Sequence, residues 1–227
     1  MCKQTFFNQS TNQQTKPQLC VYVANLEKYN QNELVGEWIN LPTTNNQIKT
    51  FLKTQVKLPT HKDQYSIHDY ESDFNHDENE SLYDLNLLAI KLEQMTKTEK
   101  NIVAAYCNAN GLKDTLSILN ICHQVNDISY VELDANTWAS REERLGCAVI
   151  EEIDTELKSA LEQCKIGENL SAYDYFDFEK YGRDLSIAEG YFANDSIFIF
   201  YTTDINHKLY TINEIKEQLN DPRSDET

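Results

Sequence analysis

The amino-acid sequence predicts an α+β protein built from three small units in a row. Strand-like apolar runs occur near both ends of the chain, whereas the middle shows only helical periodicity. The 227 residues are enough for one large domain or for two to three small ones. The charge also changes along the chain. Residues 1–62 hold seven Lys and three Glu, whereas residues 63–227 hold 34 acidic and 13 basic residues. A mildly basic beginning is therefore followed by a strongly acidic remainder.

The first unit is predicted to be a ββαβ domain over residues 18–72, after a flexible, amide-rich tail at 1–17. LCVYVAN (19–25) is rich in β-formers, YNQNE is typical of a turn, and LVGEWINL (34–41) is a second strand. Either Thr43 or Thr44 then caps a helix that runs to Val56. The alternating segment YSIHDY is expected to add a third strand.

The second unit is predicted to be a helical bundle over residues 73–128. SLYD at 81–84 resembles a capping box with Asp in place of Glu, and apolar residues then recur at helical spacing. A second helix is expected from Thr98 to Asn110, because Gly111 is a typical left-handed residue after a helix. A third helix follows it. The short links favour a compact bundle.

The third unit is predicted to be an α+β domain over residues 129–220. SYVEL is a candidate strand, SREE (140–143) is a capping box that opens a helix, and TELKSALEQC is a second helix. A turn is expected at YGRD (181–184), and SIFIFY (196–201) has the composition of a strong strand. TINE caps a last helix, after which a tail at 221–227 is expected to fray.

The composition argues against several classes of protein. No apolar run approaches the roughly 18 residues that a membrane span needs, and the N-terminus lacks the apolar middle of a secretory signal. Six cysteines without CxxC spacing are typical of reduced thiols, which predicts a cytoplasmic location. Trp38 and Trp138, like the aromatic residues of YDYFDF at 173–178, are expected to be packing residues. No cofactor is predicted.

A calcium loop is one alternative interpretation of the acidic segment at 63–90, which contains no Lys or Arg. Residues 73–84 place oxygen-bearing side chains at positions 1, 3, 5, 7, 9 and 12, as an EF-hand loop does. However, position 6 is Glu78 where the backbone requires Gly, and position 12 is Asp84 instead of the longer Glu. A solvated acidic loop is the favoured interpretation.

An acid/base enzyme is the other alternative. Paired carboxylates such as Asp174 and Asp177 fit a glycosidase only if the fold holds them at the required separation. The chain has no GxSxG motif and no Gly-rich phosphate loop, and its histidines show no metal-binding spacing. Direct binding to nucleic acid is also disfavoured, because a net charge of -17 repels phosphates. The sequence therefore predicts no enzyme.

The remaining hypothesis is that the negative surface is itself functional. The acidic part carries a net charge of -21, and B-DNA carries one charge per about 1.7 Å of axis, so this charge corresponds to about 36 Å of duplex. Only an elongated molecule can spread its carboxylates in that way. An acidic scaffold with an unrelated basic partner is the less specific alternative.

Four segments resemble the ArdA antirestriction proteins in sequence and in order. They are CVYVANLEKYNQNELVGEWINL, SIHDYES, RLGCAVIEE and YFDFEKYGRDLSIAEGYF, and all four fall within residues 18–200. The resemblance implies an elongated, three-domain DNA mimic that dimerises through its C-terminal domain. It also implies that the protein occupies the DNA-binding groove of the methyltransferase core of type I restriction-modification enzymes. Such proteins are carried by mobile genetic elements and protect incoming DNA. The tail before the first block and the helix after the last one depart from the family pattern.

The acids that fall on the resembling blocks or on the acidic segments between them are the candidate partner-binding residues. Because each exposed carboxylate contributes little to the free energy of partner binding, the prediction concerns the whole set of acids and not any single one. The candidates are Asp69, Glu71, Asp73, Asp77, Glu78, Glu80, Asp84, Asp127, Glu132, Asp134, Glu142, Glu143, Glu151, Glu152, Asp154, Glu156, Asp174, Asp177, Glu179 and Asp184. Arg183 is expected to form a local ion pair with the adjacent Asp184.

Overall fold

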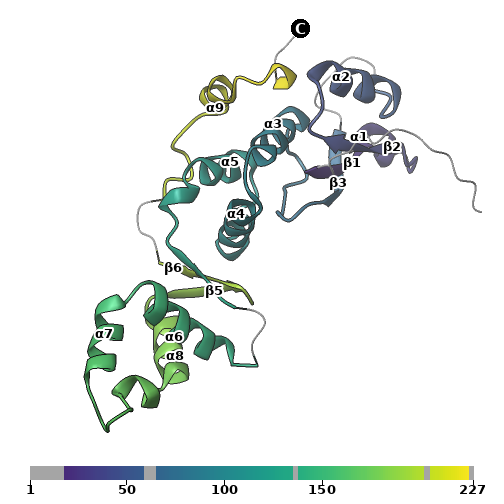
Figure 1. The fold of residues 1–227 in the computed structure, drawn as a ribbon. Helices are drawn as coiled ribbons and strands as arrows, with labels where there is room; N and C mark the ends of the chain where they lie inside the picture. The colour runs from purple at the N-terminus through teal and green to yellow at the C-terminus, as the bar shows by residue number, and fades with distance from the viewer. Residues whose placement is uncertain (1–17, 59–64, 135–137, 202–204, 225–227) are drawn as a thin grey trace, which may run out of the picture.

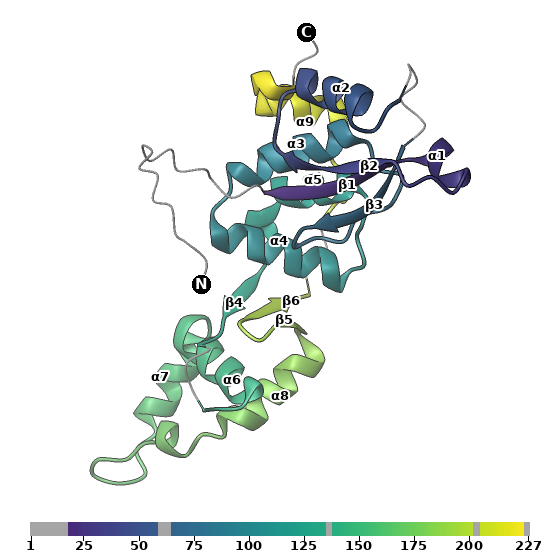
Figure 2. The ribbon, with the colours of Figure 1, turned by 90° about the vertical axis from the view of Figure 1, so that its right-hand side faces the viewer.

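The computed structural model describes residues 18–58, 65–134, 138–201 and 205–224. They form an elongated, two-lobed molecule (Figure 1), in which small sheets and helices together confirm the α+β class. The upper lobe comprises residues 18–58, 65–128 and 205–224, and the lower lobe comprises residues 129–134 and 138–201. Figure 2 shows the same two lobes from the side. The boundaries between the three expected domains stay a prediction.

The first sheet lies at one side of the upper lobe. It has the antiparallel order β2-β1-β3, with β1 at Leu19–Asn25, β2 at Gly36–Leu41 and β3 at Tyr65–Glu71. Helix α2 (Asn45–Thr54) is capped by Thr44, the second of the two expected candidates. The expected turn at YNQNE is replaced in part by a one-turn helix, α1 (Leu26–Asn30), because the side chain of Asn25 caps it.

Helix α3 (Leu82–Glu93) lies at the centre of the upper lobe (Figure 1). Leu82, Leu85 and Ala89 pack into the core of the first sheet, whereas Leu88 and Leu92 belong to the core of the helical bundle. The helix is therefore buried on several faces, which an apolar stripe on one face does not predict.

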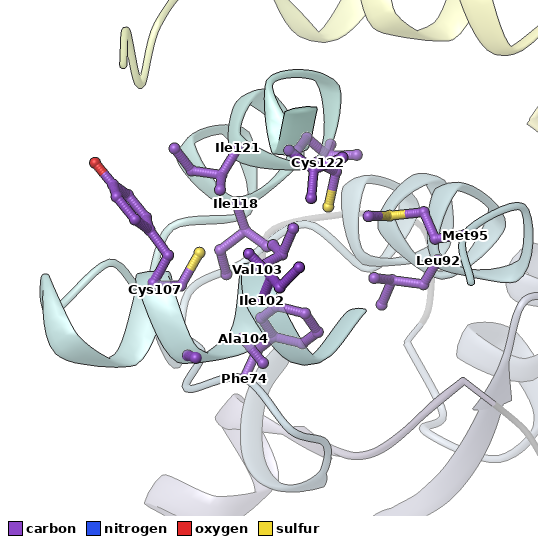
Figure 3. Close-up of a cluster of buried hydrophobic side chains, with 14 of the residues drawn as sticks. Phe74, Leu92, Met95, Ile102, Val103, Ala104, Cys107, Ile118, Ile121 and Cys122 are labelled. Carbon is purple, nitrogen blue, oxygen red and sulfur yellow. The ribbon is translucent and has the colours of Figure 1, made fainter. Parts of the chain in front are cut away.

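Two further helices, α4 (Lys97–Ala109) and α5 (Thr115–His123), complete the bundle. Helix α4 begins one residue before the expected Thr98, because Thr96 and Glu99 form a reciprocal capping box. Figure 3 shows the bundle core, in which Met95 of the α3–α4 link lies close to Cys122 of α5. A short 3-10 helix, η1 (Val125–Asp127), follows α5.

The second sheet forms the side of the lower lobe that faces the upper lobe (Figure 1). It has the order β4-β6-β5, with β4 at Tyr130–Glu132, β5 at Gly190–Asn194 and β6 at Ile197–Phe200. Ile197 and Ile199 belong to the bundle core, whereas Phe198 packs in the core of the lower lobe. Both faces of β6 are therefore covered. Strand β5 was not expected from the sequence.

The lower lobe consists of this sheet together with α6 (Arg141–Glu152), α7 (Thr155–Gln163), the 3-10 helix η2 (Ala172–Tyr175) and α8 (Phe178–Ala188). The predicted turn at YGRD is wrong, since residues 181–184 lie inside α8. Asp177 caps this helix, so its start follows a capping signal that the sequence interpretation missed.

The last segment returns to the upper lobe. Helix α9 (Ile212–Leu219) and the 3-10 helix η3 (Pro222–Ser224) pack against α3, so they do not join the other elements expected in the C-terminal unit. Asn120 and Gln124 each exchange two hydrogen bonds with the backbone of this segment, at Tyr210 and Asn206. The expectation that the tail frays from residue 221 is wrong for 221–224, where Ser224 is buried and its carbonyl accepts a hydrogen bond from Asn45. Residues 225–227 lie outside the described part of the chain.

Candidate functional site

The lower lobe carries the densest negative charge. Residues 129–201 contain sixteen Asp and Glu against six Lys and Arg. Its helices α6 and α8 cross at two glycines, Gly146 and Gly182, with no room for a side chain between them. A Cβ on Gly182 would lie 1.8 Å from the carbonyl oxygen of Glu142, and one on Gly146 would lie 2.1 Å from that of Phe178. The acidic helices are therefore held in one fixed relation by backbone contact.

Four candidate acids surround one cavity beside α6. The cavity has a volume of about 290 Å³, and Glu132, Asp134, Glu151 and Glu152 contribute to its walls. Arg144 also lines it and donates a hydrogen bond from its guanidinium to the carbonyl oxygen of Asp134 at 3.1 Å. The structure thus brings together residues that are about 20 positions apart in the sequence.

Glu151 is the most strongly tied of these four acids. It accepts hydrogen bonds from the ammonium of Lys158 and from the hydroxyl of Tyr173. The Lys158 and Tyr173 hydrogen bonds lower the pKa of Glu151, which keeps this carboxyl charged. In return, the hydrogen bond to Glu151 raises the pKa of Tyr173 to about 12. Glu151, which the sequence alone would place among the solvated surface acids, is therefore part of a hydrogen-bond network that joins α6, α7 and η2.

Some candidate acids around α7 and α8 have structural tasks as well. Asp154 and Asp177 cap these helices, and Asp174 accepts hydrogen bonds from the backbone and the hydroxyl of Ser171. Arg183 does form a local ion pair, but its partner is Glu179 at 3.2 Å, one helical turn away, so the expected pairing with Asp184 is wrong. Capping acids are still available at the surface, because a cap uses one carboxylate oxygen.

The acidic stretch that precedes α3 is only partly a surface. Asp69, Glu71, Asp73, Asp77 and Glu78 are exposed, as a negative surface requires. Glu80 and Asp84 are half-buried instead, and burial raises the pKa of both carboxyls. Glu80 accepts a hydrogen bond from the backbone N–H of Thr115, so it links this loop to α5.

The calcium interpretation gains no support from the loop geometry. Phe74 and His76 of the proposed loop are buried, and the carbonyl of Glu78 accepts hydrogen bonds from Ile67 and Ser66 of β3. The loop is thus arranged around strand β3. In the described parts of the chain no group of three or more His, Cys, Asp or Glu side chains is placed to hold a metal ion.

Taken together, fifteen of the twenty candidate acids are exposed and five are half-buried. The exposed ones are distributed over both lobes, from β3 and the following loop to α6, α7 and α8. Glu162, Glu168 and Glu189 are equally exposed lower-lobe acids that the sequence interpretation did not select, although the same charge signal includes them. The half-buried acids are Glu80, Asp84, Glu142, Glu143 and Asp154.

Other expectations are corrected by the side-chain positions. Trp138 is fully exposed and does not pack, and Tyr175 of YDYFDF is 65% exposed. Phe176 and Phe178 are half-buried against each other and against neighbouring rings. Cys107 and Cys122 are buried free thiols, whereas Cys164 is exposed. No helix in the described ranges is both long and apolar enough to cross a bilayer.

Comparison with known protein families gives one finding. The model of the antirestriction protein ArdA matches residues 21–199, which covers both sheets and the bundle between them. The chain belongs to the ArdA antirestriction protein family. The match leaves out α9 and η3, so the segment that packs on α3 lies beyond the part shared with the ArdA model.

Membership makes the chain an antirestriction protein, and the proteins of the ArdA family are inhibitors of restriction. The two crossing glycines, Gly146 and Gly182, both lie within the matched region. A search of curated proteins found no match to this sequence.

Proposed function

We propose that the protein inhibits type I restriction-modification enzymes by mimicking B-form DNA. Its surface carboxylates would occupy the DNA-binding groove of the methyltransferase core. The observation that carries this proposal is the distribution of the exposed acids, which continue from the loop beside β3 to the far helices of the lower lobe. A compact acidic body would present charge on all sides and would not resemble a rod.

The elongated shape supports this proposal. Two lobes in line (Figure 2) give the acids a long axis along which to be spread. The second sheet contributes side chains to the core of each lobe, so the lobes are joined by packing as well as by the chain. A groove shaped for stiff duplex DNA requires a ligand whose parts keep a fixed distance, and this packing holds the two lobes at one separation.

The electrostatic argument concerns many weak contacts. An exposed carboxylate paired with one basic side chain contributes roughly 0 to 1 kcal/mol. A groove that binds DNA phosphates presents many Lys and Arg together, and the binding constant falls steeply as salt screens them. Inhibition should therefore depend on the number of acids more than on any one of them.

The remaining parts of the proposal follow from the same partner. We infer a homodimer formed through the C-terminal domain, which would double the length of the acidic surface, and a cytoplasmic location in a bacterial host carrying the enzyme. The twenty candidate acids are proposed as the contact surface, with no cofactor and no catalytic role. The alternative, an acidic calcium module or a small acid/base enzyme, predicts instead that one substitution abolishes function.

The test is competition for a purified type I methyltransferase core. The protein should displace a labelled duplex carrying the target sequence, and its apparent affinity should fall by orders of magnitude between low and high salt. Inhibition that is insensitive to salt and to added duplex would overturn the proposal. Loss of function from Asp77→Asn or Asp174→Asn alone would favour the alternative.

A further inference from the structure

The outer face of the first sheet carries an arrangement that the acidic ensemble does not include. In the register of the sheet, Tyr22 of β1 lies between Trp38 of β2 and Asp69 of β3. Cys20, two residues earlier on β1, lies between Asn40 and Glu71. Because residues opposite one another in an antiparallel pair point to the same side, these six side chains share one face.

This face is open to solvent. The alternate residues of β1, Val21 and Val23, are fully buried in the core under the sheet. In Figure 2 the strands β1 and β2 lie in front of α3 and α5, with no described helix in front of them. Trp38 is 38% exposed, and both Asp69 and Glu71 are exposed.

The two aromatic rings hold each other in place. The centroids of Tyr22 and Trp38 are 5.6 Å apart and their planes are inclined by 67°, so the edge of one ring points at the face of the other. Such a pair fixes the orientation of the indole. Tyr22 is the direct neighbour of Asp69 in the sheet, so the row Trp38–Tyr22–Asp69 offers ring faces for cation–π contact at one end and a charged acceptor at the other.

The charges around the face favour a cation at the Trp38 end. Asp69 accepts a hydrogen bond from its neighbour's backbone N–H at 2.8 Å, and no ion pair within the described residues involves Asp69 or Glu71. Lys97 and Lys100 lie at the other end, where they line a cavity of about 390 Å³ together with Glu71. A second cation is therefore better placed above the row Trp38–Tyr22–Asp69, on the solvent side of the Tyr22 ring.

We propose that this face binds an arginine side chain of the protein partner, with the guanidinium against the Trp38 ring and hydrogen-bonded to Asp69. Guanidinium is the cation that both stacks on aromatic rings and bonds carboxylates in a fork, which suits this pair of groups. The proposal extends the proposed function, on which it rests. It adds a specific anchor in the first unit, whose charge alone does not suggest contact with a basic groove.

A direct probe is the fluorescence of Trp38 in the full-length protein. The chain has two tryptophans, so Trp138→Phe leaves Trp38 as the single reporter, and Trp138 lies in the lower lobe outside the proposed face. Tetra-arginine peptide should change the Trp38 emission in a saturable manner, and tetra-glutamine should not. An unchanged emission on addition of tetra-arginine would contradict the proposal.

Matched variants separate a local site from a general field. Asp69→Asn and Glu27→Gln each remove one negative charge from the first unit, and Glu27 is an exposed residue of α1, outside the proposed face. Asp69→Asn should weaken tetra-arginine binding by about fivefold or more, and Glu27→Gln by less than about twofold. Equal weakening by the two variants would show that the peptide responds only to the overall negative potential of the protein. That result would overturn the proposed site.

A single-stranded oligonucleotide provides the outcome that would identify a different class of ligand. If oligothymidylate saturates the Trp38 signal and tetra-arginine does not, the face is a base-stacking surface and the proposal is wrong. Repulsion from Asp69 and Glu71 predicts the opposite result.

Competition assays with the methyltransferase core then distinguish this inference from the proposed function. Trp38→Leu should weaken inhibition by about fivefold, whereas Trp38→Tyr, which keeps an aromatic ring, should retain it. Wild-type protein that binds tetra-arginine but does not inhibit the enzyme would refute the proposed function and leave the arginine site standing. Inhibition that is equally strong in wild type and Trp38→Leu would refute the site alone.

Discussion

Gly146 of α6 and Gly182 of α8 lie back to back where the two helices cross. A Cβ on Gly146 would be 3.2 Å from the backbone nitrogen of Gly182, and one on Gly182 would be 2.7 Å from that of Gly146. Both glycines belong to sequence blocks that resemble the ArdA family, RLGCAVIEE and EKYGRDL. The physical reason for glycine at both positions is the close approach of two backbones.

Gly182→Ala should destabilise the lower lobe by roughly 2 to 4 kcal/mol, because the new methyl group would collide with the carbonyl of Glu142. Urea unfolding followed by circular dichroism measures the change. Gly167→Ala is the matched control, since its Cβ would meet only Leu170 at 4.0 Å. If both variants unfold at the same urea concentration, the helix crossing does not exclude a side chain at Gly182, and the prediction is wrong.

Stability should fall with acidification between pH 6.5 and about 4 because of His76. Burial lowers the pKa of His76 from 6.5 to about 4. In this window the unfolded chain binds a proton that the folded protein does not, so each step down in pH favours unfolding, and the effect is complete below pH 4. His76→Gln should remove about 3 kcal/mol of this pH dependence. The free energy of unfolding of wild type and of His76→Gln is measured at pH 6.5 and at pH 4, and the difference between the two proteins gives the contribution of His76. If both proteins lose the same stability over this window, the prediction is wrong.

The ionisation of Tyr173 should report the network around Glu151. The hydrogen bond to Glu151 raises the pKa of Tyr173 to about 12, and the negative charge of Glu151 adds to this. Glu151→Gln removes the charge, so the pKa of Tyr173 should move back toward 10, which NMR titration of the ring signals can follow. Glu156→Gln on α7 is a control of equal charge. A similar shift in both variants would indicate a general field and not a hydrogen bond.

Single neutralisations on the acidic surface should have little effect on inhibition. Glu152→Gln is expected to change the inhibition constant by less than about threefold, since an exposed pair contributes below roughly 1 kcal/mol. Neutralising ten exposed acids of the lower lobe should abolish inhibition while circular dichroism shows the fold retained. A steep loss with Glu152→Gln alone would point to a conventional site and away from a distributed one.

The return segment should stabilise the upper lobe. Arg223 bonds Glu93 at the end of α3 and Asp221 beside it, both at 2.8 Å, and these hydrogen bonds raise the pKa of Arg223 and lower that of Asp221. Arg223→Ala should increase amide hydrogen exchange in α9 and η3 and lower stability by about 1 kcal/mol. Arg183→Ala, which breaks an exposed pair on α8, is the control. Unchanged exchange in α9 would show that the apolar contact of Ile215 is sufficient.

Local patterns predicted the elements of the upper lobe well, because their signals are local. Thr44 and Ser81 act as helix caps as predicted, and the alternation of Val21 and Val23 places one face of β1 in the core. The turn expected at YGRD failed for an equally physical reason. Gly182 suggests a break in a helix, but here glycine permits a helix crossing, and its partner Gly146 is 36 residues away.

The candidate acids could be chosen by charge but not ranked by environment. The sequence does not distinguish Glu80, which bonds the backbone of Thr115 in a half-buried position, from the exposed Glu78 two residues earlier. Nor does it show that Tyr22, Trp38 and Asp69 share a face, because the strands that carry them become neighbours only when the sheet forms. Capping and alternation are local signals, whereas burial and register depend on tertiary packing.

Strand β6 has a mechanical consequence for the whole molecule. Its consecutive residues Ile197, Phe198 and Ile199 supply side chains alternately to the bundle core and to the core of the lower lobe. Losing either core would expose the residues that complete the other, so neither lobe can melt without weakening its neighbour. Heating should therefore give one cooperative transition, with both lobes denaturing together at a common temperature.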